Sequence, residues 1–177
     1  MLRKKYLSCD LCVVGGGMSG LVAAISAAKN GVKTILVEKN STLGGTMTTG
    51  GVNFPGLFFA WGKQIIGGPC WEAIERTVAL GGAVLPSISV RPKRHWHEQI
   101  TLNPFVYTTV LFQMCEEAGV RLFFHSKLGD AIVENGVVKY AGGQEIITEE
   151  VIYDVFDVHV SIVEIDHHKL IVGGHIH

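Results

Sequence analysis

Three glycines and one acidic residue have the types and the spacing that suit binding of a diphosphate. Gly15, Gly17 and Gly20 form a G-x-G-x-x-G directly after a short apolar run, and Glu38 follows about 20 positions later. In this fingerprint the first glycine permits a tight turn, the second lets a pyrophosphate approach the backbone, and the third lets a helix pack closely on a strand. A carboxylate at position 38 can accept hydrogen bonds from both ribose hydroxyls and would repel a 2′-phosphate. The pattern predicts a dinucleotide site and disfavours NADP.

The elements that must position these residues are a strand, a helix and a second strand. Residues 10–14 are apolar and partly β-branched, which is typical of a buried parallel strand, and residues 32–37 repeat that pattern. Between them, residues 18–30 predict a helix rich in small side chains. Met18 and Ser19 lie at its beginning, where free N–H groups and the positive end of the helix dipole attract a diphosphate.

Composition sets broad limits on the class of protein. The 177 residues are 47% hydrophobic and 18% charged, which favours one globular domain with a sizeable core. A formal net charge of -1 offers no electrostatic reason to expect nucleic acid or an anionic membrane as partner. No stretch has the length and polarity of a membrane span or the organisation of a secretion signal. We therefore expect a cytoplasmic location and free thiols at all four cysteines.

A long loop rich in glycine and threonine follows the second strand. It runs from 41 to 53 and contains the pair Gly44-Gly45 followed by Thr46, whereas an NAD-binding domain typically proceeds promptly to another helix. Residues 10–38 together with 43–51 resemble the amino terminus of the FAD-dependent oxidoreductases that have a glutathione-reductase-type FAD domain and are related to the succinate dehydrogenase and fumarate reductase flavoproteins. The resemblance covers roughly residues 8–143.

The resemblance implies that FAD is the cofactor and that a hydride passes between a substrate carbon and flavin N5. It places Gly44 and Gly45 against the pyrophosphate and ribityl chain, and Thr46 with the next few residues near the flavin ring. It also places Lys39 beside the cofactor, next to Glu38, and lets the turn that ends at Leu128 contact adenine through its backbone. These roles come from the resemblance and not from residue spacing.

The middle of the chain permits two interpretations. Residues 53–98 predict a loop-rich insertion with a helix over 71–80, and this insertion would either form the cavity beside the flavin or pack as a hydrophobic lid on the sheet. The segment 91–97 gathers basic, histidine and tryptophan side chains that could bind a carboxylate substrate or donate a proton. A solvated loop is the favoured interpretation of this segment.

The following elements complete the predicted fold. Pro104 suits the first turn of a helix that runs to Glu117, and residues 120–125 predict a third parallel strand. Asn135-Gly136 between apolar runs predicts a β-hairpin with a type I′ turn. The fold class expected is therefore α/β, a Rossmann-like FAD/NAD(P)-binding fold with a parallel sheet plus a β-hairpin or meander.

The expected domain organisation is a FAD-binding domain over 1–143 and a β-rich tail over 144–177 that could complete the sheet. The family's further segments, including its substrate domain, are not recognised after residue 143, so we expect the FAD-binding portion of a flavoprotein with no assignable catalytic residue and an unknown small-molecule substrate. The strands of the tail could mediate self-association.

No metal site is predicted, because His175 and His177 lack a third ligand. Cys9 and Cys12 are interpreted as ordinary cysteines on opposite faces of a strand.

Two alternatives to a flavoprotein stay open on the residues alone. One is an NAD-binding domain, which the Gly44-Gly45 loop disfavours. The other is a non-catalytic α/β remnant or interaction module, which would take up neither dinucleotide. The visible absorption spectrum of the purified protein distinguishes a flavoprotein from such a module.

Overall fold

The chain folds into two compact units in the computed structural model. The structure describes residues 7–60, 62–86, 99–142, 159–165 and 168–175. The first unit is Met1–Ser126 and the second is Lys127–His177. The polar–aromatic segment 91–97 lies outside the described residues, so its role stays a prediction. No helix in the described part of the chain is long and apolar enough to cross a membrane.

A parallel sheet of three strands forms the frame of the first unit. Its strands are β1 (Leu11–Val14), β2 (Thr34–Val37) and β5 (Arg121–Phe123), in the order β1-β2-β5. Val13 pairs with Leu36, and Leu36 pairs with Leu122, so the strands run in register. Parallel neighbours require crossover connections, which helices provide here. The predicted α/β Rossmann-like class is confirmed.

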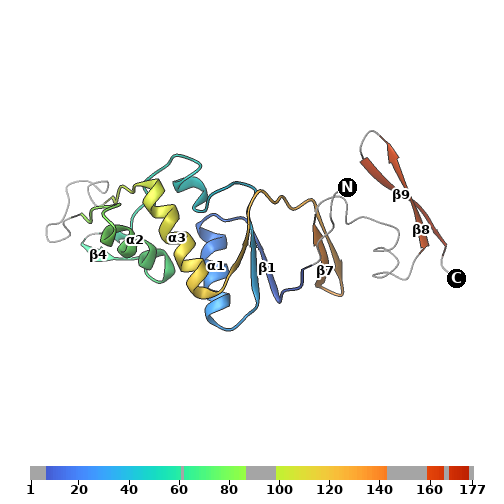
Figure 1. Cartoon of the computed structure of the whole chain (residues 1–177), viewed down its shortest axis with the longest axis horizontal. Coiled ribbons are helices and arrows are strands. Elements are labelled where there is room, and N and C mark those ends of the chain that lie inside the picture. The colour runs from blue at the N-terminus through green and yellow to red at the C-terminus, as the bar shows by residue number, and fades with distance from the viewer. Residues whose placement is uncertain (1–6, 61, 87–98, 143–158, 166–167, 176–177) are drawn as a thin grey trace. The chain divides into compact units, whose positions relative to one another are not determined.

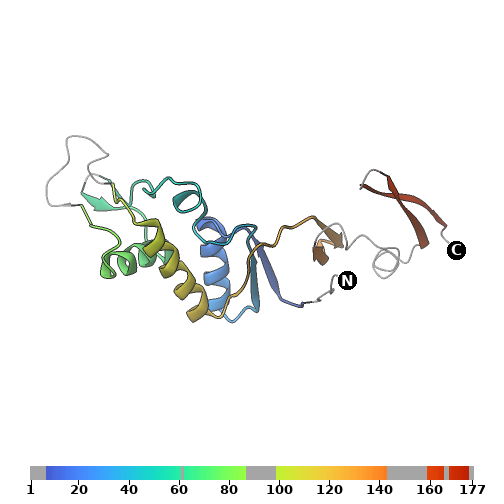
Figure 2. The same ribbon diagram turned by 45° about the horizontal axis from the view of Figure 1, so that its top comes forward.

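In the described part of the first unit, three α-helices accompany the sheet. They are α1 (Met18–Lys29), α2 (Pro69–Ala79) and α3 (Pro104–Ala118). In Figures 1 and 2, α1 and α3 lie side by side, and all three helices lie to one side of the sheet. The helix ends that proline and glycine predict for α3 are confirmed, because this helix begins at Pro104 and ends at Ala118, directly before Gly119.

The core lies between that helical layer and one face of the sheet. Leu36 on β2 and Leu21 on α1 are fully buried in it, whereas Ile35 points to the opposite face, on the same side as Cys12. The largest side chain in the core is Tyr107, which is completely buried. Burial of this kind, rather than helix propensity, stabilises the short helices. Other fully or nearly fully buried members are Ala24, Ile25, Leu43, Ala73, Ile74, Ile100, Leu102, Val110, Leu111, Met114 and Cys115.

Helix α3 has a side-chain cap that can be tested. Asn103 Oδ1 accepts hydrogen bonds from the backbone N–H groups of Phe105 (3.0 Å) and Val106 (3.3 Å). We expect Asn103→Ala to lower the free energy of unfolding by about 1 kcal/mol, measured by urea denaturation, because these N–H groups lose their acceptor. Asn103→Asp keeps a capping oxygen and should stay close to wild type. Equal midpoints for all three proteins would contradict this account of the cap.

Short elements connect the larger ones. The loop after β2 contains a 3₁₀ helix, η1 (Gly45–Met47), and a small antiparallel pair, β3 (Phe59–Ala60) and β4 (Lys63–Gln64), precedes α2. Trp71 on α2 packs edge-on against Phe59, with ring centroids 5.3 Å apart.

The described residues of the second unit form two antiparallel hairpins. The first joins β6 (Asp130–Glu134) to β7 (Val137–Gly142). Asn135 and Gly136 both have positive φ angles, 50° and 77°, so the predicted type I′ turn is confirmed. The second joins β8 (His159–Ile165) to β9 (His168–His175), where strands were predicted. The sheet-completing role of the tail and the domain boundary at 143 remain predictions.

Candidate functional site

The glycine-rich turn lies at the carboxyl edge of the parallel sheet. Gly15 follows β1 directly, and its N–H donates to the carbonyl of Val37 at the end of β2 (2.8 Å). The chain then enters α1 through Gly17, which is the N-cap and offers no side-chain cap. No acidic side chain lies in the first turn of α1. The N–H groups at this helix end therefore have no side-chain acceptor within the first turn, and no carboxylate in that turn neutralises the positive end of the helix dipole.

Gly20 and Gly17 differ sharply in the space around them. A Cβ on Gly20 would lie 2.0 Å from the carbonyl oxygen of Gly15 and 3.3 Å from Cγ1 of Val13. A Cβ on Gly17 would meet nothing within 4 Å. Gly20 is thus required by the packing of α1 on the turn, which is the role that its spacing predicts. The absence of a side chain at Gly17 leaves open space next to the helix N-terminus.

A second glycine segment faces the first. The N–H of Gly44 donates to the carbonyl of Gly16 (2.8 Å), and Gly44 forms a parallel bridge with Gly17. The φ of Gly44 is +104°, and a Cβ there would lie 2.5 Å from Cγ2 of Thr48. Only glycine fits this position, because both the backbone conformation and the contact exclude a side chain.

The loop that carries Gly44 is held by side-chain hydroxyl groups. Leu43 is fully buried, and its carbonyl accepts hydrogen bonds from Oγ1 of Thr48 (2.6 Å) and from Oγ1 of Thr108 on α3 (3.1 Å). The second of these bonds links the loop to a helix that lies 65 residues further along the chain. Sequence reasoning missed both threonines. Thr48 is only five residues from Leu43, but its type does not specify the acceptor, and nothing in the local pattern indicates a partner as distant as Thr108.

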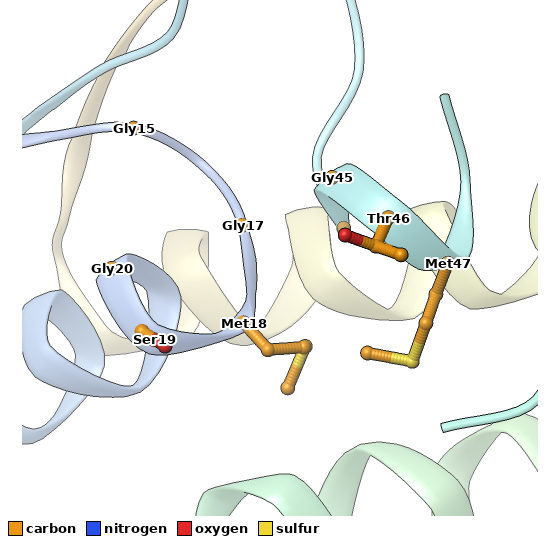
Figure 3. A pocket seen from close by; sticks show the side chains of 9 residues that line it. Gly15, Gly17, Met18, Ser19, Gly20, Gly45, Thr46 and Met47 are labelled. Atoms are coloured by element: carbon orange, nitrogen blue, oxygen red, sulfur yellow. The ribbon is translucent and has the colours of Figure 1, made fainter. Parts of the chain in front are cut away.

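The two glycine segments enclose an open pocket of about 340 Å³. Figure 3 shows the turn into α1 on one side and η1 on the other, with the side chains of Met18 and Met47 extending toward each other. Every lining residue except Met47 is among the predicted cofactor-binding residues, and Met47 directly follows Thr46 in the segment that the resemblance places near the flavin ring. The lining residues are Gly15, Gly17, Met18, Ser19, Gly20, Gly44, Gly45, Thr46 and Met47.

Met18 is anchored from the core. Oη of Tyr107 donates a hydrogen bond to the sulfur of Met18 (3.0 Å). Burial raises the pKa of Tyr107, so this phenol stays protonated and remains a donor throughout the neutral range. Helix α3 thereby fixes one side chain of the pocket.

Glu38 contacts the glycine turn, is not among the pocket-lining residues and is only 6% exposed. Its Oε2 accepts a hydrogen bond from the N–H of Gly16 (2.6 Å), and Oε1 accepts one from the N–H of Asn40 (2.7 Å). The carboxylate therefore fastens the glycine turn to the end of β2. Each oxygen has a second lone pair, so the group keeps acceptor capacity for a further donor.

The carboxyl ends of β2 and β5 meet beside Glu38. The N–H of Ser126 donates to the carbonyl of Glu38 (3.1 Å), and the N–H of His125 donates to that of Asn40 (3.3 Å). Lys39 is exposed and is not among the pocket-lining residues, and Leu128 belongs to the second unit. Their predicted contacts with a cofactor stay predictions.

The described part of the chain contains no group of three or more His, Cys, Asp or Glu residues that could hold a metal ion. The four free cysteines are Cys9, Cys12, Cys70 and Cys115. Burial raises the pKa of Cys115 to about 11, so it is a buried thiol rather than a nucleophile at neutral pH.

Sheet topology, glycine turn and pocket together define a nucleotide-binding α/β protein of the Rossmann-like type. The family model described as FAD dependent oxidoreductase matches residues 10–152. The chain therefore belongs to the FAD-dependent oxidoreductase family.

Curated relatives match over very different lengths. Thiamine thiazole synthase of Solidesulfovibrio magneticus is 30% identical over 141 residues, which are 78% of this chain and 47% of that protein. The mitochondrial dihydrolipoyl dehydrogenase of Caenorhabditis elegans is 68% identical over 37 residues, which are 21% of this chain and 8% of that protein. The chain spans about half the length of the first relative and a small part of the second.

Among solved structures, the alignment with the THI4 protein of Thermovibrio ammonificans covers 78% of this chain and 49% of the THI4 chain, at 20% identity and a TM-score of 0.47. A geranylgeranyl bacteriochlorophyll reductase-like protein of Thermoplasma acidophilum aligns with 75% of this chain and 34% of its own, at 21% identity and a TM-score of 0.49.

Proposed function

We propose that this chain binds the ADP half of FAD in the pocket between the two glycine segments, and that it is the FAD-binding portion of a flavoprotein oxidoreductase. Membership of the FAD-dependent oxidoreductase family supports the choice of cofactor. The observation that carries the proposal is the open space at Gly17, beside an uncapped helix N-terminus and opposite Gly44 and Gly45.

The pocket suits a pyrophosphate in shape and in charge. On one side of the pocket, Gly17 presents backbone without a side chain. On the other side, a hydrogen bond to Gly16 holds Gly44 in place. A diphosphate could therefore approach the backbone N–H groups directly. The first turn of α1 contributes the positive end of its dipole. The side chains of Met18 and Met47, which extend toward each other from the two walls, provide flexible apolar surface. The residues that would hold FAD are thus Gly15, Gly17 to Gly20 and Gly44 to Met47.

Glu38 has two tasks in this proposal. It holds the glycine turn through the Gly16 N–H, and its remaining lone pairs would accept hydrogen bonds from the ribose hydroxyls. A 2′-phosphate at that place would meet a buried carboxylate, and this repulsion selects against NADP.

The chemistry of an oxidoreductase of this kind belongs to the isoalloxazine ring, which exchanges a hydride with the substrate when FAD is bound. The residues of this chain would contribute binding and orientation. The glycine turn would fix the pyrophosphate, and η1, which contains Gly45, Thr46 and Met47, would position the ribityl chain and the flavin ring. No side chain in the described residues is assigned to proton transfer, and the substrate stays undefined. The cytoplasmic location expected from the sequence stays a prediction.

Reversing the charge at Glu38 tests its role. We expect Glu38→Arg to lose most of the FAD that the wild-type chain retains after gel filtration, because the turn loses its acceptor and the ribose hydroxyls lose theirs. Glu75→Arg is the matched control, since Glu75 is exposed on α2 and away from the pocket. Retention of FAD by the Glu38 variant at the wild-type level would refute the role given to this carboxylate.

A further inference from the structure

Two methionine side chains face each other across the pocket. Met18 extends from the first turn of α1 and Met47 from η1, and Figure 3 shows the two side chains pointing toward each other. Both residues are half-buried, and each packs against the core with part of its side chain. Methionine sulfur is a soft nucleophile that peroxides oxidise where they can reach it. Because the pocket is open and holds about 340 Å³, a small oxidant can enter between these side chains.

The environments of the two sulfur atoms differ. The sulfur of Met18 accepts a hydrogen bond from Oη of Tyr107 (3.0 Å). Within the residues that the structure describes, no donor contacts the sulfur of Met47. A hydrogen bond to a thioether occupies a lone pair of the sulfur and withdraws electron density from it, which lowers its nucleophilicity. Met47 should therefore react with a peroxide before Met18.

A third methionine provides an internal reference. Met114 on α3 is only 2% exposed and belongs to the core. Reagents reach its sulfur only when the core opens, so it should be the slowest of the three to react. The expected order of oxidation is Met47, then Met18, then Met114.

We propose that Met47 is a site of reversible oxidation by hydrogen peroxide and that its sulfoxide closes the pocket to FAD. The sulfur attacks one peroxide oxygen, and the S–O bond forms as the O–O bond breaks. The departing hydroxide takes the proton of the transferred oxygen and leaves as water. The sulfur loses two electrons, and the peroxide gains them. Methionine sulfoxide reductases reverse the change.

The location of Met47 connects its oxidation with cofactor binding. Met47 belongs to η1, which would position the ribityl chain and the flavin ring, so this consequence rests on the proposed function. Its thioether offers apolar surface to the pocket, whereas a sulfoxide oxygen is a polar acceptor. Covering that oxygen with a cofactor costs free energy if no donor meets it. We therefore expect oxidation of Met47 to weaken FAD binding about fivefold or more.

The first measurement maps oxidation in the absence of FAD. The full chain is treated with hydrogen peroxide for increasing times, quenched with catalase and digested with trypsin. The three methionines fall in separate peptides, 6–29, 40–63 and 95–121, and fragmentation in the mass spectrometer assigns each added oxygen to a sulfur. We expect Met47 to gain oxygen first.

Tyr107→Phe tests the protection of Met18 within the same measurement. The variant keeps the aromatic ring in the core and removes the hydrogen-bond donor. The rate of Met18 oxidation relative to that of Met47 should rise about threefold or more. This ratio is read within one sample, so it does not depend on the peroxide dose. Slow oxidation of Met114 in the variant shows that its core stays closed.

The second measurement compares FAD affinity before and after a peroxide dose that oxidises Met47 and spares Met18. Dithiothreitol is then added to every sample, because it reduces cysteine disulfides and leaves sulfoxides in place. By flavin fluorescence titration, the wild-type chain should lose affinity about fivefold or more, and sulfoxide reductases should restore it. Met47→Leu removes the reactive sulfur. Whatever the starting affinity of this variant, peroxide should leave that affinity unchanged.

Three results would overturn the proposal. One is oxidation of Met18 or Met114 ahead of Met47 in the wild-type chain. Another is an unchanged affinity for FAD when Met47 is fully oxidised. The third is an equal loss of affinity in Met47→Leu, which would assign the effect to another residue. A wild-type chain that binds no FAD before peroxide treatment would instead refute the proposed function, and with it the effect on FAD, while the order of oxidation is decided without FAD.

Discussion

Gly17→Ala is expected to weaken FAD binding about tenfold or more, equivalent to about 1.4 kcal/mol, while the fold is kept. The added Cβ meets no protein atom within 4 Å, so it occupies only the open space where the pyrophosphate would approach. The φ of Gly17 is −72°, which alanine adopts without strain. Loss of glycine at the N-cap should cost about 1 kcal/mol of stability or less. Flavin fluorescence titration measures the affinity, and thermal denaturation followed by circular dichroism measures the stability.

Gly67→Ala is the matched control for this change. Gly67 is exposed, and its Cβ would also meet nothing within 4 Å, but it lies outside the pocket. It should bind FAD like the wild type. Equal FAD affinities for the Gly17 variant, the Gly67 variant and the wild-type chain would show that the space at Gly17 is not used by the cofactor.

Gly20→Ala should instead destabilise the fold itself. Its Cβ would lie 2.0 Å from the carbonyl oxygen of Gly15, which is backbone and cannot rotate away. Either α1 or the turn must shift, and we expect a loss of about 3 kcal/mol or more in the free energy of unfolding. FAD binding should fall with it, because the turn that moves is one wall of the pocket. Urea denaturation in the absence of FAD measures the first effect.

Ser26→Ala is the control within the same helix. Ser26 lies in the interior of α1, and alanine there should leave stability unchanged or slightly raise it, since alanine has the higher helix propensity. A Gly20 variant as stable as the Ser26 variant would contradict the close packing of α1 against the turn.

Much of the frame could be predicted because it depends on local pattern. The apolar runs, the glycine fingerprint, Pro104 at a helix start and Asn135-Gly136 at a turn each specify a conformation within a few residues. The pocket could be predicted for the same reason, since two short glycine segments make up its walls. The residues that stayed hidden act at long range: Thr108 on the Leu43 carbonyl, and Tyr107 on Met18.

Departures from regular geometry could not be predicted either. The N–H groups of Asp10 and Leu11 both donate to one carbonyl, that of Lys33 just before β2, and no local pattern indicates this shared acceptor. Glu38 was assigned to a ribose by its position alone, and the structure adds that it fastens the glycine turn through Gly16. Such roles depend on which backbone groups meet after folding, and the spacing of residue types does not contain that information.

The visible absorption spectrum of the purified full chain, mixed with FAD and passed through gel filtration, tests the central claim most directly. We predict that flavin absorption elutes with the protein, that excess ADP displaces it, and that Gly17→Ala loses it while remaining folded. A colourless, folded wild-type chain that takes up no FAD under these conditions would contradict the assignment of the glycine pocket to this cofactor.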